Sequence, residues 1–209
     1  MDTAAPEELV RRCQATLPED TQAFEQLVAL YKDRVFATAY RLMGNRQDAE
    51  DQAQEVFLKI YRGIKNLDDA ATLTSWIYRI TTNTCFDALN KQKRRPKTTT
   101  LTPPDDGSEE LRYADTRTPD PEEAALRREA WLCLEKSLAA LDETGRAALI
   151  LRDIEDRSYQ EIAEIMAVGL SAVKMRIHRA RLAFQQTLEK VCPGLKVIAQ
   201  ARGGATSLN

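Results

Sequence analysis

The sequence predicts an all-α protein made of two small helical domains joined by a flexible linker. Apolar residues recur at spacings of three and four in both halves of the chain, as at Val35, Ala39 and Leu42. No stretch alternates apolar and polar residues as a half-buried strand would. Between the helical parts, residues 96–121 hold five of the eight prolines and few apolar side chains. These observations together favour two helical units over one continuous domain.

We place the first domain at residues 1–95. Gly44 suits the position just after a helix, because glycine adopts the left-handed conformation that ends many helices. Asn45, with Asp48 three residues later, is typical of a new helix N-cap. A further helix is expected from about Ser75 to Lys91. The first domain is therefore predicted to be a helical bundle.

The linker at residues 96–121 is rich in proline, threonine and acidic residues. Such a segment cannot bury enough apolar surface to offset the entropy lost on ordering. A long ordered loop within one domain is the alternative, but loops of this length are uncommon in compact domains. We also expect the C-terminal tail, residues 191–209, to be disordered, and its role stays open.

The second domain, residues 122–190, contains a predicted helix-turn-helix. Ser158 and Glu161 form the pattern of a capping box at the start of one helix. A turn around Gly169 follows, and Ser171 is a good N-cap for the next helix. In DNA-binding versions of this motif the second helix enters the major groove.

Charge distribution favours DNA binding over a purely structural helical hairpin. The whole chain has 30 basic and 32 acidic residues, yet no Asp or Glu occurs from Ile165 to Leu188. A structural helix usually mixes both signs on its outer face, whereas a basic face attracts phosphates and offers donors to guanine. The basic residues of the second helix are Lys174, Arg176, Arg179 and Arg181.

Two further polar faces lie in the first domain. Tyr78, Arg79 and Asn83 share a helix that ends in a basic cluster, and such residues suit an unstacked DNA strand because bases stack on rings. Trp76 and Phe86 on the same helix are expected in the core. The helix after Asn45 carries a polar, acidic face, which an ordinary solvated surface would also explain; its residues are Asp48, Asp51, Gln54 and Glu55.

Composition argues against catalysis, metal binding and a membrane span. The chain has one histidine, His178, and no glycine-rich phosphate loop, so we expect neither an enzyme nor a cofactor. The four cysteines are far apart, which supports neither a zinc site nor a redox pair. Cys85 and Cys133 are predicted to be buried free thiols, and a regulatory thiol at Cys192 is left open. Without an apolar signal or spanning segment, the protein is expected to be soluble and cytoplasmic.

Four segments together resemble the extracytoplasmic-function (ECF) branch of the bacterial sigma-70 family. They are Asp48–Phe57, Trp76–Asn83, Leu141–Arg152 and the Ser-Tyr-Gln-Glu-Ile-Ala unit at 158–163. The resemblance covers about residues 20–95 and 122–190. It implies a sigma factor that binds core RNA polymerase, recognises the −10 and −35 promoter elements and nucleates DNA melting. The alternative is a helix-turn-helix repressor or activator that acts without polymerase.

The resemblance also implies roles for single residues. The acidic face Asp48, Asp51, Gln54 and Glu55 would dock on the clamp helices of the polymerase β′ subunit, and the β subunit is a further expected contact. The implied −10 residues are Leu67, Thr74, Ser75, Tyr78, Arg79 and Asn83. The implied −35 residues are Ser171, Lys174, Met175, Arg176, Arg179 and Arg181.

Two points qualify this assignment of partners and roles. Asn83 has an alternative role, because its amide would also serve as a bridge or cap between helices. Members of the family are commonly restrained by an anti-sigma factor, often membrane-bound, and we expect such a partner here. No small-molecule substrate is expected.

Overall fold

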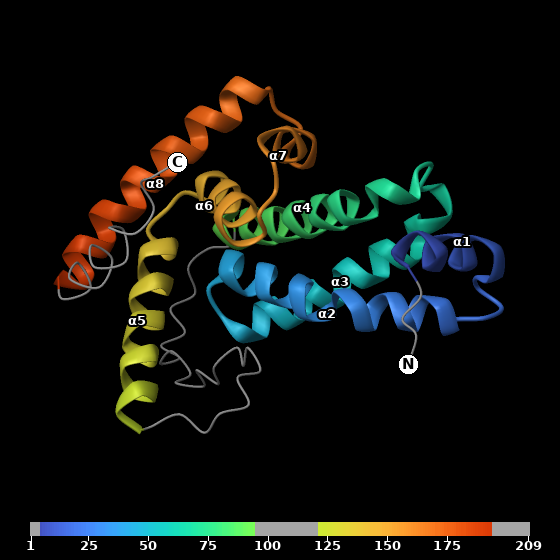
Figure 1. Cartoon of the computed structure of the whole chain (residues 1–209), viewed down its shortest axis with the longest axis horizontal. Coiled ribbons are helices and arrows are strands. Elements are labelled where there is room, and N and C mark those ends of the chain that lie inside the picture. The colour runs from blue at the N-terminus through green and yellow to red at the C-terminus, as the bar shows by residue number, and fades with distance from the viewer. Residues whose placement is uncertain (1–4, 95–120, 194–209) are drawn as a thin grey trace, which may run out of the picture.

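The computed structural model describes residues 5–94 and 121–193, and all regular structure in these two ranges is helical (Figure 1). This confirms the predicted fold class. The first half of the chain contains α1 (Pro6–Thr16), α2 (Gln22–Met43), α3 (Arg46–Gly63), the 3-10 turns η1 (Ile64–Asn66) and η2 (Ala70–Thr72), and α4 (Leu73–Arg94). The second half contains α5 (Pro121–Ala139), α6 (Glu143–Leu149), the π-helical turn η3 (Ile150–Ile154), α7 (Tyr159–Met166) and α8 (Leu170–Val191).

The turn between α2 and α3 follows the capping signals read from the sequence. Gly44 ends α2 with a φ of 78°, a left-handed conformation that costs glycine little. Asn45 then caps α3, since its side-chain oxygen accepts a hydrogen bond from the Asp48 amide at 2.8 Å. The Asn45 amide group also donates to the Asp48 carboxylate at 2.7 Å. A sharp reversal results, and it packs α3 against α2.

Helix α1 is an element that the sequence analysis did not predict. Its apolar face is short, and Leu9, Val10 and Cys13 are all fully buried against the first half's core. Fully burying a Val or Leu side chain stabilises by about 1.5–3 kcal/mol. The Gln14 side chain adds polar contacts, donating to the carbonyls of Ile64 and Leu67 at 3.1 and 2.9 Å. Helix α1 therefore holds η1 and Leu67, the residue that follows it, in place.

The helix-turn-helix is formed by α7 and α8, as predicted, with one difference at the start of α8. Ser158 and Glu161 form the complete capping box, each side chain bonding the other residue's backbone N–H. Helix α8, however, begins at Leu170 with Gly169 as its N-cap, so the predicted cap at Ser171 is wrong. The first helical bond runs from the Val173 amide to the Gly169 carbonyl, which places Ser171 inside the first turn.

The two halves pack directly against each other through α6, η3 and α7, an arrangement that the sequence analysis did not anticipate (Figure 1). Ala147 and Ile150 join a buried cluster with Ala39, Leu42 and Cys85 of the first half. Tyr78 of α4 lies in another cluster whose other members all come from the second half. The predicted linker at 96–121 lies outside the described residues except for its last residue, which begins α5.

Two cysteines depart from expectation, because Cys133 and Cys192 form a disulfide with a Cα–Cα distance of 6.1 Å. The prediction of a free thiol at Cys133 is therefore wrong, and the sequence analysis did not anticipate this disulfide. Helices α5 and α8 run side by side and bring together residues 59 positions apart. Cys13 and Cys85 are free and buried, as predicted for Cys85, and burial raises the pKa of the Cys85 thiol to about 12.

We predict that reducing the Cys133–Cys192 bond destabilises the second half. A bond closing a loop of this length restricts the unfolded chain, which is typically worth about 2–4 kcal/mol. Reductant should lower the melting temperature of the wild type and leave that of Cys192→Ser unchanged. Cys13→Ser is the control, because its melting temperature should still fall on reduction. Peptide mapping without reductant that finds Cys133 and Cys192 unlinked would contradict the pairing.

Candidate nucleic-acid and polymerase interfaces

Helix α3 presents the acidic face that the resemblance assigns to polymerase. Asp51 and Gln54 are exposed, and Glu55 is half-buried on the same side of the helix. Asp48 is engaged in the structure, since its carboxylate also accepts a hydrogen bond from the Gln92 side chain at 2.8 Å. Asp48 thus joins the start of α3 to the end of α4. Asp51, Gln54 and Glu55 form the available part of this face.

The predicted −10 residues divide into a buried support and an exposed edge. Leu67 is buried in the core of the first half, and the Thr74 hydroxyl shares a hydrogen bond of 2.9 Å with the Tyr31 hydroxyl. Ser75, in the first turn of α4, is half-buried. Arg79 and Asn83 are exposed on α4, one helical turn apart. The structure therefore brings Arg79 and Asn83 together on an accessible surface.

Tyr78 differs from its neighbours on α4, because only 3% of it is exposed. Its ring lies among second-half residues such as Leu151 and Ile162, and its hydroxyl donates a hydrogen bond to Glu155. Burial, followed by that hydrogen bond, raises the pKa of Tyr78 well above its ordinary value. The Arg157 guanidinium lies 5.7 Å from the ring centroid. In this conformation the second half of the chain covers Tyr78, and the role predicted for it stays a prediction.

Helix α8 separates a buried stripe from a basic face. Val173, Ile177 and Ala180 are buried and hold the helix to α6 and α7. On the other side lie four exposed candidate −35 residues, Ser171, Lys174, Met175 and Arg179; Arg181 is exposed as well. Met175 is 51% exposed although it is apolar, so it can contact a base edge such as a thymine methyl. This face is open to a duplex.

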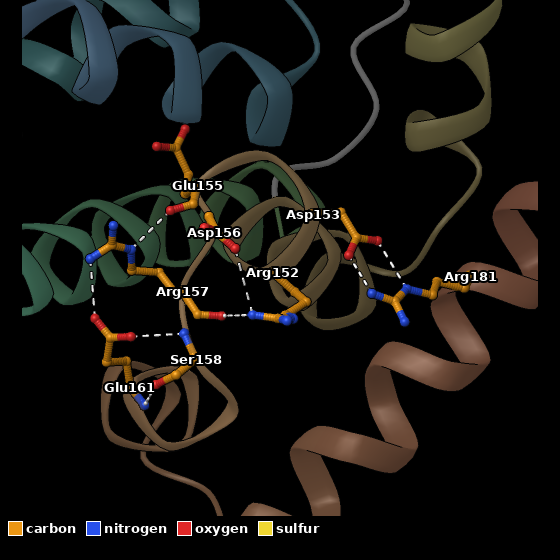
Figure 2. A network of polar contacts seen from close by, with 8 residues as sticks. All are labelled: Arg152, Asp153, Glu155, Asp156, Arg157, Ser158, Glu161 and Arg181. Atoms are coloured by element: carbon orange, nitrogen blue, oxygen red, sulfur yellow. Dashed lines mark hydrogen bonds and ion pairs between the residues drawn. The ribbon is translucent and has the colours of Figure 1, made fainter. Parts of the chain in front are cut away.

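Arg181 and Arg176 both lie close to acidic side chains in the second half of the chain. Figure 2 shows the Arg181 guanidinium reaching back to both carboxylate oxygens of Asp153, and this pairing raises the pKa of Arg181. Arg176 is half-buried and close enough to Asp142 to help lower the pKa of that carboxyl, after the hydrogen bond from Thr144. A phosphate contact by Arg181 would require its release from Asp153.

Sequence reasoning missed the residues that join the two halves. Arg146 is buried, and its guanidinium donates to the Leu42 carbonyl at 2.7 Å, across the interface. Glu155 faces α2 and α4 from the end of η3. Arg146 stands next to the apolar run Ala147–Leu151, and a charged residue beside such a run was the available signal. Glu155 lies four residues beyond the run and carried no such signal.

A cavity of about 730 Å³ opens beside this interface. It is mostly apolar, and its walls come from both halves of the chain. Among its lining residues are Tyr40, Trp131, Leu134, Leu138, Ile154 and Phe184. Within the described ranges no group of His, Cys, Asp and Glu side chains is placed to hold a metal ion. None of the helices described there is long and apolar enough to cross a membrane.

The helix-turn-helix and the exposed basic face of α8 are typical of a helical DNA-binding protein, with candidate interfaces in each half of the chain. Comparison with known protein families likewise matches the two halves of the chain to two separate family regions. Residues 27–95 match the sigma-70 region 2 family, and residues 131–184 match sigma-70 region 4. The predicted polymerase and −10 residues fall in the first match, and the −35 residues fall in the second.

Characterised relatives extend this likeness over most of the chain. RNA polymerase sigma-H factor of Pseudomonas aeruginosa is 34% identical over 88% of this chain and 93% of its own length. The ECF sigma factor SigW of Bacillus subtilis is 32% identical over 81% of this chain and 90% of its own. The ECF sigma-E factor of Escherichia coli K12 is 31% identical over 81% of this chain and 88% of its own length. The chain belongs to the sigma-70 family of RNA polymerase sigma factors, in the ECF group.

Solved structures agree on the fold. CnrH, in complex with the cytosolic domain of CnrY, is 22% identical with a TM-score of 0.59, covering 90% of this chain and 99% of that one. RpoE of Bartonella quintana, in complex with the anti-sigma factor NepR, is also 22% identical with a TM-score of 0.59. That match covers 79% of this chain and 96% of RpoE.

We predict different effects for two arginines of α8. Arg179→Ala should cost about 1–3 kcal/mol on the best −35 duplex and relax base preference at one position, because Arg179 lies on the exposed face of α8 opposite its buried stripe. Arg181→Ala should act alike on all sequences, since Arg181 points about 200° away around the helix. Selection from random duplexes by each full-length variant measures both effects. Equal, sequence-independent losses would remove the base-reading role of Arg179.

Proposed function

We propose that the chain initiates transcription through three separate surfaces. As an ECF sigma factor it binds RNA polymerase and directs initiation at promoters. In the proposal, Asp51, Gln54 and Glu55 of α3 dock on the β′ clamp helices, and the second half contacts the β subunit. The observation that carries the assignment is the segregation of charge: α3 carries the acidic face, and α8 has no acidic residue from Leu170 to Leu188.

In the proposal, DNA is engaged at two places. The exposed face of α8, with Lys174, Met175 and Arg179, reads the −35 duplex in the major groove. The segment 67–74, which contains η2 and the first residues of α4, holds together with Asn83 a base flipped from the −10 strand, which nucleates melting. Removing a base from the stack costs a few kcal/mol, and contacts in a pocket must offset that cost. Joining two weak contacts in one chain raises the effective concentration of the second.

We also propose a restraining partner, an anti-sigma factor, with the cytoplasm as the place of action. Two observations support this partner. Structural neighbours were solved in complex with CnrY and with the anti-sigma factor NepR. The apolar cavity beside the interface of the two halves offers surface for another protein. Catalytic chemistry has no part in the proposal.

The direct test is transcription in vitro with purified core polymerase on a pool of genomic fragments. The proposal expects discrete transcripts that need both the chain and core enzyme. Specific duplex binding by a dimer, with no polymerase-dependent transcript, would favour the alternative of a repressor or activator.

We predict that Asp51→Lys combined with Glu55→Lys weakens binding to core polymerase. Reversal turns attraction to a basic partner into repulsion, so the loss should shrink as salt rises. Fluorescence titration of labelled chain with core enzyme measures the affinity. Asp33→Lys with Glu19→Lys is the matched control, because both residues are exposed and the change in net charge is the same. Equal affinities for the two double variants would remove the docking assignment.

We predict that Asn83→Ala lowers affinity for single-stranded −10 DNA more than affinity for −35 duplex. The exposed Asn83 amide can hydrogen-bond an unpaired base, and its removal leaves α8 untouched. The measurement compares both probes with polymerase-bound chain, and circular dichroism checks the helical content. Equal losses on both probes would instead indicate that Asn83 acts through folding as a bridge between helices.

A further inference from the structure

We propose that Asp153 acts as an internal mimic of a DNA phosphate, which occupies Arg181 and weakens the sequence-independent binding of α8 to duplex DNA. This inference rests on the proposed role of α8 at the −35 duplex. It adds a residue outside the helix that sets how tightly the basic face holds any DNA, whatever its sequence.

Arg181 lies at the edge of the exposed face of α8. It comes directly after the buried Ala180 and one turn after the buried Ile177, so it flanks the buried stripe. Lys174 lies seven residues earlier, which puts it on nearly the same side of the helix, about 10 Å away along the axis. A helix in the major groove presents its outer face to the bases, while residues along its edges contact the phosphates that border the groove. Arg181 is therefore placed to meet a phosphate.

In the structure the Arg181 guanidinium is already occupied. Its Nε donates to one carboxylate oxygen of Asp153 at 3.0 Å, and its Nη2 donates to the other oxygen (Figure 2). Arginine binds carboxylates and phosphates alike through such paired hydrogen bonds, because its planar fork matches either group. Asp153 thus takes the donors that a phosphate would take. Since α8 has no acidic residue before Glu189, the competing carboxylate comes from η3, 28 positions earlier in the chain.

This ion pair lies on the surface, which limits what it adds to stability. The Arg181 and Asp153 side chains are 48% and 37% exposed. Exposed ion pairs contribute little to folding, since water weakens the attraction and both side chains must be ordered. The turn η3 is held instead by Ile150 and Leu151, which are fully buried. Removing the Asp153 charge should therefore leave the fold intact and change mainly the electrostatics of α8.

Asp142, a second carboxylate near the basic face, has a different role. It caps α6, because it accepts hydrogen bonds from the Gly145 amide at 3.2 Å and from the Thr144 hydroxyl at 2.6 Å. By contrast, both hydrogen bonds that the Asp153 carboxylate accepts in the described part of the chain come from Arg181. Asp153 is therefore the carboxylate whose contacts are directed at α8.

Occupying one arginine has a defined effect on DNA binding. Each phosphate contact adds about one unit to the slope of log affinity against log salt, so at 0.1 M salt one contact is worth about tenfold in affinity. The loss that Asp153 causes should fall on every sequence alike, because phosphate contacts carry no base information. Weaker binding to the many non-promoter sites of a chromosome leaves more of the chain free for polymerase.

The test compares full-length wild type and Asp153→Asn on two labelled duplexes, one of random sequence and one carrying the best −35 sequence from selection. Fluorescence anisotropy at several salt concentrations gives each affinity and its salt slope. Asp153→Asn should bind both duplexes about tenfold more tightly at 0.1 M salt, with a slope steeper by about one unit and an unchanged base preference. A purely structural role for Asp153 predicts the opposite, weaker binding together with a lower melting temperature.

Further variants isolate the pair. Asp156→Asn is the matched control, because it removes the same charge three residues away, from a side chain that is 96% exposed and lies near Arg152 instead of α8. Asp153→Glu keeps a carboxylate within reach of Arg181 and should bind DNA as the wild type does. Asp153→Ala leaves no acceptor and should match Asp153→Asn. In an Arg181→Ala background, Asp153→Asn should raise the affinity no more than Asp156→Asn does, since no guanidinium is left to release.

The outcomes separate this proposal from the proposed function. Equal gains from Asp153→Asn and Asp156→Asn, or weaker binding by Asp153→Asn, would overturn the role of Asp153. A gain that persists in full without Arg181 would overturn it as well. Failure of the −35 assignment would look different: selection would yield no preferred duplex for the wild type, while the random duplex would still report the gain from Asp153→Asn.

Discussion

The interface between the two halves depends on the short segment Arg146–Glu155, which runs from α6 through the π-helical turn η3 and leads into α7, the helix that packs on α4. It carries Arg146 at one end and Glu155 at the other, with the apolar run Ala147–Leu151 between them. Apolar burial supplies most of the attraction, since it is roughly proportional to area. The two charged residues fix the relative orientation of the halves, because each can make its hydrogen bonds in only one arrangement. The covering of Tyr78 and Cys85 follows from this placement.

This arrangement links stability to function. A sigma factor needs two DNA-reading surfaces that fit separate promoter elements, and the second half covers Tyr78, a residue proposed for one of them. The polar partners at this interface are Thr38, Arg41, Tyr78, Lys93 and Glu143, all of which water can solvate when the halves separate. The packed and separated arrangements of the halves can therefore differ by a modest free energy, and binding can shift their populations.

Local signals in the sequence predicted local structure well. The caps at Asn45 and Ser158 depend on residues only three apart, and both were predicted correctly. The start of α8 was misplaced by two residues because Ser171 is a better cap by residue type than Gly169, whose extended backbone provides the cap here. Helix α1 was missed because its apolar face is only three residues, and its stability comes from tertiary packing.

Contacts between distant residues were beyond sequence reasoning. Tyr78 and Glu155 are 77 positions apart, and Cys133 and Cys192 are 59 apart, so no periodicity or motif encodes either pair. In the candidate sites, too, local sequence pattern predicted some features, whereas others depend on contacts between distant residues. The exposure of Asp51, Asn83 and the α8 face agrees with the amphipathic pattern of each helix. The burial of Tyr78 depends instead on how the second half folds back.

The most direct measurement of the central claim is the distance between the two halves, free and bound to polymerase. Labels on α1 and on the exposed face of α8, read by single-molecule fluorescence energy transfer, report that distance in the intact chain. The account predicts one short-distance population for the free chain and a long-distance population once core polymerase and promoter DNA are bound. A free chain already in the long-distance state, or a bound chain that keeps the short distance, would contradict it.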